Sequence, residues 1–154
     1  FKIQKEEITL EEWNEKYYQP FSFGETITTD YANYRGTDWD YGGRVYSGAY
    51  GKGPKGIFRE QTTEVGSFPP NAFGLYDLHG NVYEWCADYW HENYDGAPTD
   101  GSAWLSDNEN NYRLLRGGSW GFDPRFCRSA DRVRGLPVSR NDFVGLRVVA
   151  PSRT

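Results

Sequence analysis

Apolar side chains keep a period of two in three short stretches of the chain. From Val82 to Trp90, aromatic and small apolar residues occupy alternate positions, which predicts a strand with one aromatic face. Leu114-Leu115, just before a Gly-Gly break, predicts a second strand. β-Branched residues at alternate positions from Val144 to Ala150 predict a third.

The segment between Trp120 and Gly145 keeps neither a period of two nor one of 3.6. Its apolar residues are interleaved with arginines, prolines and small polar residues. Such a run between two strands is typical of irregular surface chain that is held by a scaffold, which is where binding sites usually lie. This pattern favours a binding site within this segment.

The N-terminal part predicts one helix and then a long loop region. Thr9 and Glu12 form a capping box, so we expect a short helix that ends before Pro20. From Phe21 to Gly56 the chain is rich in Gly, Tyr, Asp and Thr, and its many aromatic residues favour an ordered loop region over disorder. Long stretches without Gly or Pro are nearly absent after Pro20. The expected fold is therefore one loop-rich α+β or mainly β domain over residues 1–154.

Charge is unevenly distributed along the chain. The net charge is -5, yet residues 113–154 carry nine arginines, no lysine and three aspartates. A basic end is compatible with a nucleic-acid partner. Arginines in strand-like and turn-rich segments also satisfy backbone carbonyls and carboxylates, so we expect structural arginines here and no specific nucleic-acid site.

Location is left open by the sequence. A transmembrane helix needs about 18 consecutive apolar residues, and because no such stretch exists we expect no membrane span. A signal-peptide pattern is also absent, which favours the cytoplasm. Phe1 is not a natural start, so we expect a fragment or a processed form of a longer protein.

Residues that bind metals are few. Cys86 and Cys127 can form one disulfide or remain two thiols, and zinc-site spacing is missing. His79 and His91 are expected to be ordinary surface or hydrogen-bonding side chains. Two oxygen-bearing side chains, Asn81 and Glu84, are candidate ligands for a hard cation such as Ca²⁺, because calcium prefers oxygen ligands. The alternative is that they form a hydrogen-bonded pair.

Four separated blocks carry a family resemblance. They are FPPNAFGLYDLHGNVYEWCADYW (68–90), LLRGGSW (114–120), RSADRVR (128–134) and VGLRVV (144–149). In this order they resemble the sulfatase-modifying-factor domain of the formylglycine-generating enzyme family, over roughly residues 57–150. The resemblance implies a variant of the C-type lectin fold, an α+β domain that is loop-rich with small antiparallel sheets.

The resemblance also bears on catalysis. Family members that generate formylglycine resemble one another in carrying two nearby cysteines after the GGS block, whose thiolates bind copper and attack the substrate cysteine. In this chain only Cys127 remains, and Phe122 lies near the place of its partner. Without a thiol pair, a histidine constellation or an acid/base pair, we expect a protein that is not an enzyme. The alternative is a formylglycine-generating oxidase-like enzyme that uses Cys127, with or without Cys86.

A second resemblance lies within residues 114–149. The segment is similar to the variable proteins of diversity-generating retroelements, in which adenine mutagenesis rewrites asparagine codons near the C-terminus of a lectin-like domain. Asn141 would be unmutated. The substituted positions, which the resemblance marks as ligand-binding residues, are Gly121, Phe122, Asp123, Phe126, Asp131, Val133, Gly135, Leu136, Val138, Ser139, Asp142 and Phe143.

The residue types at these positions fit that origin. Each can be encoded by a codon that differs from AAC only at its adenines, whereas Lys, Glu, Gln, Met and Trp are not reachable in this way. All five types are absent from Gly121 to Val149. The intervening residues would form a fixed frame. The frame positions are Arg128, Ser129, Ala130, Arg132, Arg134, Pro137 and Arg140.

Together these observations predict a ligand-binding protein with a hypervariable, exposed patch on residues 121–143. Apolar anchors rimmed by small polar residues are typical of protein recognition, so the expected target is a protein or another macromolecule. Two alternatives remain besides the enzyme. The apolar residues can be ordinary core, or the domain can be a sensor module of a larger signalling protein.

Overall fold

A computed structural model describes residues 18–106 and 111–148 of the chain. The helix expected after Thr9, and the last two residues of the strand expected to reach Ala150, lie outside these ranges. In the described part, no helix is long and apolar enough to cross a membrane. The helical element of the described part is the short 3-10 helix η1 (Pro124–Cys127).

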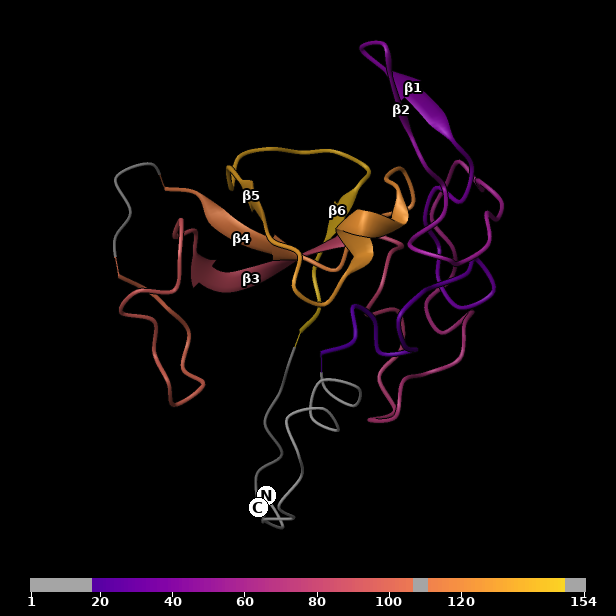
Figure 1. Ribbon diagram of the computed structural model, residues 1–154. Coiled ribbons are helices and arrows are strands. Elements are labelled where there is room, and N and C mark those ends of the chain that lie inside the picture. The colour runs from indigo at the N-terminus through magenta and orange to yellow at the C-terminus, as the bar shows by residue number, and fades with distance from the viewer. Residues whose placement is uncertain (1–17, 107–110, 149–154) are drawn as a thin grey trace.

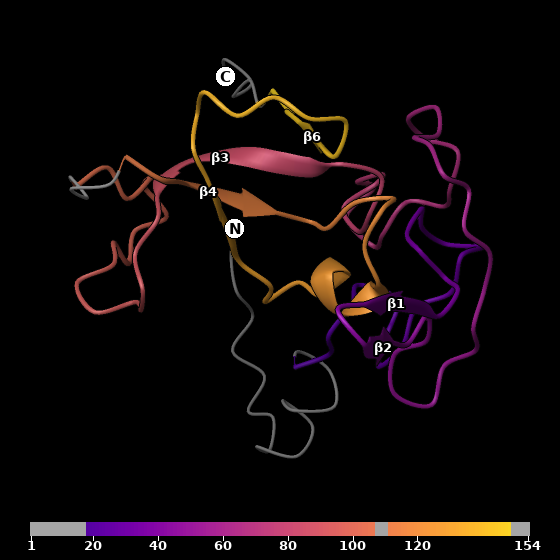
Figure 2. The same cartoon turned by 90° about the horizontal axis from the view of Figure 1, so that it is seen from above.

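The four-stranded sheet joins distant parts of the sequence (Figures 1 and 2). Its strands are β3 (Tyr83–Tyr89), β4 (Arg113–Arg116), β5 (Val133–Gly135) and β6 (Val144–Gly145), in the order β5-β4-β3-β6. The strands expected around 82–90 and 114–115 are confirmed. The C-terminal strand starts at the expected residue but is only two residues long, and it pairs parallel to β3. The sheet is therefore mixed and not purely antiparallel.

The strand β4 ends at a double glycine. Gly117 and Gly118 have φ values of 95° and 79°, which L side chains rarely adopt. The chain turns there toward η1, and a Cβ atom on Gly118 would lie 2.6 Å from Sγ of Cys127. The Gly-Gly break thus sets where the irregular segment leaves the sheet.

A hairpin of β1 (Trp39–Tyr41) and β2 (Arg44–Tyr46) extends away from the four-stranded sheet (Figure 1). Gly42 and Gly43 connect its strands with φ values of 62° and 78°, as a type I′ turn requires. This region was predicted to be loop, and for the two strands of the hairpin that prediction was wrong. The signal was present, because a Gly-Gly pair between aromatic residues is a hairpin pattern.

The buried core lies mainly in the loops. Phe21, Ile27, Ala32 and Tyr34 form one cluster with Cys127. The hydroxyl of Tyr34 donates to the carbonyl of Ile27 at 3.0 Å, so its polar end is satisfied. The aromatic residues of the 21–56 region therefore hold an ordered loop structure, as predicted.

Residues 79–81 connect this core to the sheet. The backbone N–H of Asn81 donates to the carbonyl of Asn33 at 2.7 Å, and a Cβ on Gly80 would lie 2.3 Å from that same oxygen. Only glycine permits so close an approach of two backbones. The Leu-His-Gly-Asn run therefore fixes the start of β3 against the loops.

Candidate ligand-binding surface

Arginines of the predicted frame and of the adjoining strand β4 bind backbone carbonyls. Arg116, at the end of β4, donates through Nη1 to the carbonyls of Ser129 and Asp131 at 2.9 and 2.7 Å. Arg128 donates through Nε to the carbonyl of Arg125 at 2.9 Å. These bonds tie the irregular segment to the sheet without regular secondary structure.

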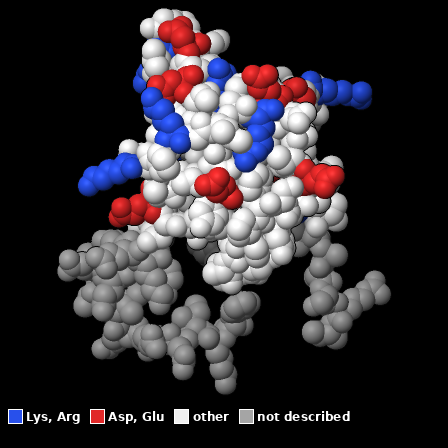
Figure 3. Space-filling view, turned by 90° about the vertical axis from the view of Figure 1, so that its right-hand side faces the viewer, with Lys and Arg blue, Asp and Glu red and all other residues white. Residues whose placement is uncertain are grey.

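The prediction of structural arginines is confirmed. Seven of the eight arginines between residues 113 and 148 donate hydrogen bonds to carbonyl or carboxylate oxygens, and Arg140 is the exception among the described contacts. On the face shown in Figure 3, basic and acidic side chains are intermingled. That face therefore presents no basic stripe of the kind that binds nucleic acid.

The twelve substituted positions differ in exposure. Four side chains are exposed, seven are partly exposed and one, Asp123, is fully buried. Val138 is the most open of the apolar ones, with 83% of its surface accessible. All of the expected patch except Asp123 is therefore at least partly exposed. Its aromatic residues are only partly exposed, and their rings contact one another.

Aromatic rings of this segment form one cluster. Phe122 lies 5.4 Å from both Phe126 and Phe143 between ring centroids, in edge-to-face contacts. Phe143 also lies 4.9 Å from Trp120, and Tyr83 on β3 lies 5.7 Å from Phe122. Such arrangements are favourable beyond their buried area, so the rings hold each other in place.

A groove of about 340 Å³ opens beside this cluster, and we call it the aromatic groove. Its floor belongs to the sheet and includes Trp85 of β3 and Leu115 of β4. Half of the substituted positions line it, so residues that the sequence marked as a set are brought together in space. These lining positions are Phe122, Val133, Gly135, Leu136, Ser139 and Phe143.

Asp123 departs from the expected pattern. It was predicted to point outward, but it is 0% exposed and caps η1, where its Oδ1 accepts from the N–H of Arg125 at 3.1 Å. The guanidinium of Arg125 also binds both carboxylate oxygens, at 2.8 and 2.9 Å. Asp123 is therefore a structural residue, because a buried carboxylate must be paired.

Asn81 and Glu84 do not fit the calcium prediction. Oδ1 of Asn81 already accepts from the N–H of Thr63 at 2.9 Å and from Nδ2 of Asn33 at 3.2 Å. Glu84 forms a two-pronged ion pair with Arg147, with Nη2–Oε1 at 2.6 Å and Nε–Oε2 at 2.9 Å. Within the described residues no cluster of three His, Cys, Asp or Glu side chains is present. The two side chains do not pair with each other. The calcium site stays a prediction, and the partners that both side chains already have oppose it.

The two cysteines are free thiols in different surroundings. Cys127 is 0% exposed, and burial raises its pKa, with the carboxylates of Asp123 and Asp131 acting in the same direction. Cys86 is partly buried, and burial raises its pKa as well. Since the thiolate is the nucleophile and the metal ligand, neither environment activates a cysteine.

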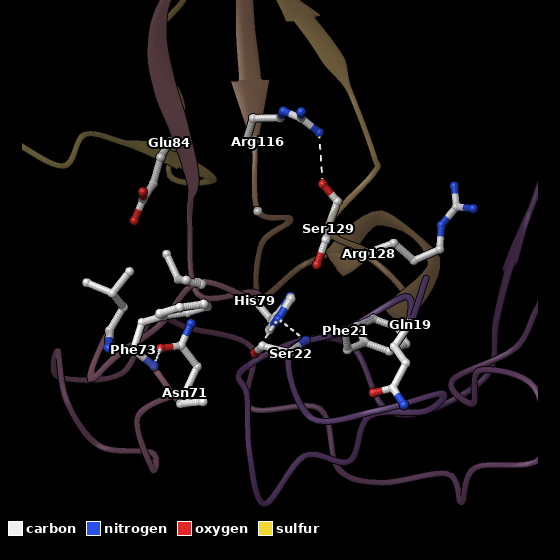
Figure 4. A pocket seen from close by; sticks show the side chains of 14 residues that line it. Gln19, Phe21, Ser22, Asn71, Phe73, His79, Glu84, Arg116, Arg128 and Ser129 are labelled. Atoms are coloured by element: carbon white, nitrogen blue, oxygen red, sulfur yellow. Dashed lines mark hydrogen bonds between the residues drawn. The ribbon is translucent and has the colours of Figure 1, made fainter. Parts of the chain in front are cut away.

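A second hollow, of about 710 Å³, lies between the N-terminal loops and the ends of β3 and β4 (Figure 4), and we call it the His79 groove. Phe21 and His79 line it, and Phe73, 81% exposed, stands at its edge. Nε2 of His79 accepts from the backbone N–H of Ser22 at 2.9 Å, so Nδ1 carries the proton and donates to the carbonyl of Cys127 at 2.7 Å. This groove was not predicted from the sequence, and its lining residues come from the 68–90 block, from the N-terminal loops and from residues near the end of β4 and after η1.

His91 has a different role from His79. Its ring stacks on Trp104 at 3.5 Å between centroids, and Nε2 lies 3.2 Å from the hydroxyl of Ser106. Both histidines are thus hydrogen-bonding side chains, as predicted. Neither is part of a described metal cluster.

The sequence profile of the sulfatase-modifying factor enzyme 1-like domain matches residues 19–151. The chain belongs to this family. Among curated relatives it is 35% identical over 96 residues to the formylglycine-generating enzyme of Thermomonospora curvata, covering 58% of this chain and 31% of that protein. It is 36% identical over 107 residues to the inactive C-alpha-formylglycine-generating enzyme 2 of Bos taurus, covering 63% and 31%.

Another relative belongs to a different class. The chain is 40% identical over 92 residues to the serine/threonine-protein kinase pkn1 of Chlamydia pneumoniae, covering 59% of this chain and 15% of the kinase. The chain thus spans less than a third of the length of each of these relatives.

Solved structures agree with the expected fold. PvdO from Pseudomonas aeruginosa is 53% identical with a TM-score of 0.53, covering 56% of this chain and 33% of that one. Treponema denticola variable protein 1 is 27% identical with a TM-score of 0.53, covering 77% and 35%. The loop-rich, C-type-lectin-like fold is confirmed. The likeness to a variable protein supports the second resemblance stated from residues 114–149.

Proposed function

We propose that this domain is a non-catalytic ligand-binding variable protein of a diversity-generating retroelement, with its binding surface on residues 121–143. The observation that carries the proposal is the aromatic groove. Six of the twelve substituted positions line it, while its floor comes from β3 and β4. A fixed floor with variable walls is what a receptor needs if its specificity is to change without loss of the fold.

The arginine bonds give this surface its rigidity. Arg116 and Arg128 hold residues 125–131 through carbonyls, and these bonds do not depend on the side chains at the substituted positions between them. A surface that is already ordered loses little conformational freedom on binding. Exposed apolar groups such as Val138 beside small polar residues such as Ser139 match the anatomy of a recognition site.

The gene itself provides the direct test. We expect a near-repeat of the 3′ coding segment close by, with adenines at the substituted positions, next to a reverse transcriptase gene. A locus that lacks both would contradict a retroelement origin. The binding surface would then have to be judged on binding measurements alone.

Catalysis through Cys127 is the competing function. The formylglycine-generating relatives favour it, whereas the complete burial of Cys127 opposes it. We expect iodoacetamide to modify Cys86 in the folded protein and Cys127 only after unfolding, read by peptide mass spectrometry. Copper uptake by wild type that is lost in Cys127→Ala would instead support the enzyme.

A sensor module of a longer protein is a second candidate. The match to the chlamydial kinase favours this role, because the matched segment is only a small part, 15%, of a longer signalling protein. Such a role is compatible with a binding surface on residues 121–143. A full-length gene that encodes a signalling domain upstream of Phe1 would support it.

A further inference from the structure

Gly135 determines the floor of the aromatic groove. A Cβ atom at this position would lie 2.7 Å from Cη2 of Trp85 and 2.9 Å from Cδ1 of Leu115. Both contacts are closer than ordinary van der Waals separation, and both residues line the groove. Any side chain at residue 135 would therefore push the indole of Trp85 out of its present place.

Gly121 has the same relation to the ring of Phe143. A Cβ atom there would lie 2.3 Å from Cε1 of Phe143, whose ring lines the groove. Neither Gly121 nor Gly135 has a positive φ, so their backbones do not demand glycine. The absence of a side chain at these two substituted positions is a matter of space for the rings.

The lining of the groove defines what fits it. Arg134 is the one charged residue among the lining residues, and the rest are mainly aromatic and aliphatic. Its guanidinium lies 5.0 Å from the ring centroid of Tyr112 and 3.4 Å from a carboxylate oxygen of Glu92. The side chains of that ion pair are 53% and 79% exposed, so the pair contributes little, and an incoming carboxylate can replace Glu92 at small cost.

We propose that Gly121 and Gly135 open the aromatic groove to a single aromatic side chain of a protein partner, and that Arg134 binds a carboxylate beside that side chain. The inference rests on the proposed function and specifies its ligand. A volume of about 340 Å³ is at the small end of ligand pockets, which suits one inserted ring. Positive charge at the rim complements an acidic neighbour.

The groove is then a property of this variant of the surface. A different residue at position 135 would reposition Trp85 and make a groove of another shape on the same floor. Gly121 and Gly135 are thus specificity-determining residues, because they act through rings that contact the partner.

Peptide selection tests the proposal. A random peptide library displayed on phage is panned against the full chain, and we expect enriched peptides to contain an aromatic residue next to Asp or Glu. The affinity of the most enriched synthetic peptide is then measured by fluorescence anisotropy. Gly135→Ala should weaken its binding about tenfold or more, because anchor pockets dominate such interfaces.

Matched variants separate the groove from its surroundings. Ser139→Trp should fill the groove from its exposed rim and weaken binding about tenfold or more, which keeps the test decisive if Gly135→Ala does not fold. Arg134→Gln should weaken binding and reduce its dependence on salt. Arg140→Gln, which changes an arginine outside the lining, should leave binding unchanged.

The outcomes distinguish this inference from the proposed function. Peptides that bind Ser139→Trp as well as wild type, yet bind Val138→Asn or Asp142→Ala weakly, would overturn the groove and leave the 121–143 surface standing. Enriched peptides without aromatic residues would also overturn it. If selection yields no peptide that depends on residues 121–143, both proposals fail.

Discussion

The two grooves of this domain differ in what their walls do for the fold. None of the twelve substituted positions lines the His79 groove, whereas six of them line the aromatic groove. In the His79 groove, Phe21 belongs to the buried cluster and His79 connects two loops through hydrogen bonds. Residues that line the His79 groove also belong to the core, so we expect them to tolerate few substitutions. The larger volume of the His79 groove therefore does not make it the better candidate for the ligand-binding surface.

The aromatic groove separates these tasks. Trp85 and Leu115 come from paired strands, and the positions predicted to vary pack beside them. Neither Gly121 nor Gly135 has a positive φ, so we expect substitutions there to change the shape of the groove more than the backbone.

Phe21→Ala should have the largest effect. Phe21 is 2% exposed and lies edge-on to Tyr50 and His79, with centroids at 5.0 and 5.6 Å. Removing such a ring leaves a cavity, and we expect the free energy of unfolding in urea to fall by about 3–5 kcal/mol. Val138→Asn on the variable surface is the control and should change it by less than about 0.5 kcal/mol. Equal effects of the two variants would remove the distinction between the grooves.

Asp123→Ala should cost less than the core variant but more than changes at the exposed substituted positions. It removes the cap of η1 and the partner of Arg125, and we expect a loss of about 1–3 kcal/mol in urea unfolding. Asp142→Ala, at an exposed substituted position, is the matched control and should be nearly neutral. A neutral Asp123→Ala would mean that this position is as free to vary as its neighbours.

Acid should weaken the fold through His79. Burial lowers the pKa of His79 from its ordinary value of 6.5, so the unfolded state binds the proton more readily than the folded state does. The stabilising contribution of neutral His79 is present above about pH 6.5 and is lost as pH falls below it, by up to about 1.4 kcal/mol for each pH unit. Urea unfolding of wild type and His79→Gln between pH 5 and 7.5 measures this. Parallel pH profiles would contradict it.

Calcium should have the smallest effect. Glu84 lines the His79 groove but is paired with Arg147, and Asn81 is hydrogen-bonded to Thr63 and Asn33. We therefore expect the melting temperature to be the same in EDTA and in millimolar calcium chloride. A higher melting temperature with calcium, lost in Asn81→Ala, would restore the metal site and assign a ligand to this side of the molecule.

Local patterns predicted the strands that are stabilised by local alternation. The strands at Tyr83–Tyr89 and around Leu114-Leu115 were predicted correctly. In a strand, the face to which a side chain points depends only on its position along that strand, so the sequence pattern shows it directly. The hairpin at residues 39–46 was missed, since Gly42-Gly43 stood among many other glycines. β6 comprises only Val144–Gly145, and the side chain of Arg147 after it binds Glu84 and the carbonyl of Tyr76.

Ordered motifs and residue types in the sequence predicted the family and the loop-rich fold, which are confirmed, and the set of substituted positions, which stays a prediction. Which of those positions are exposed was set by tertiary packing. Asp123 is buried and paired with Arg125, a local contact that the sequence pattern did not reveal. Gly135 lies against Trp85 through packing between distant parts of the chain. The partners of Asn81 and Glu84 likewise come from distant residues, Thr63 and Arg147, which a local pattern does not contain.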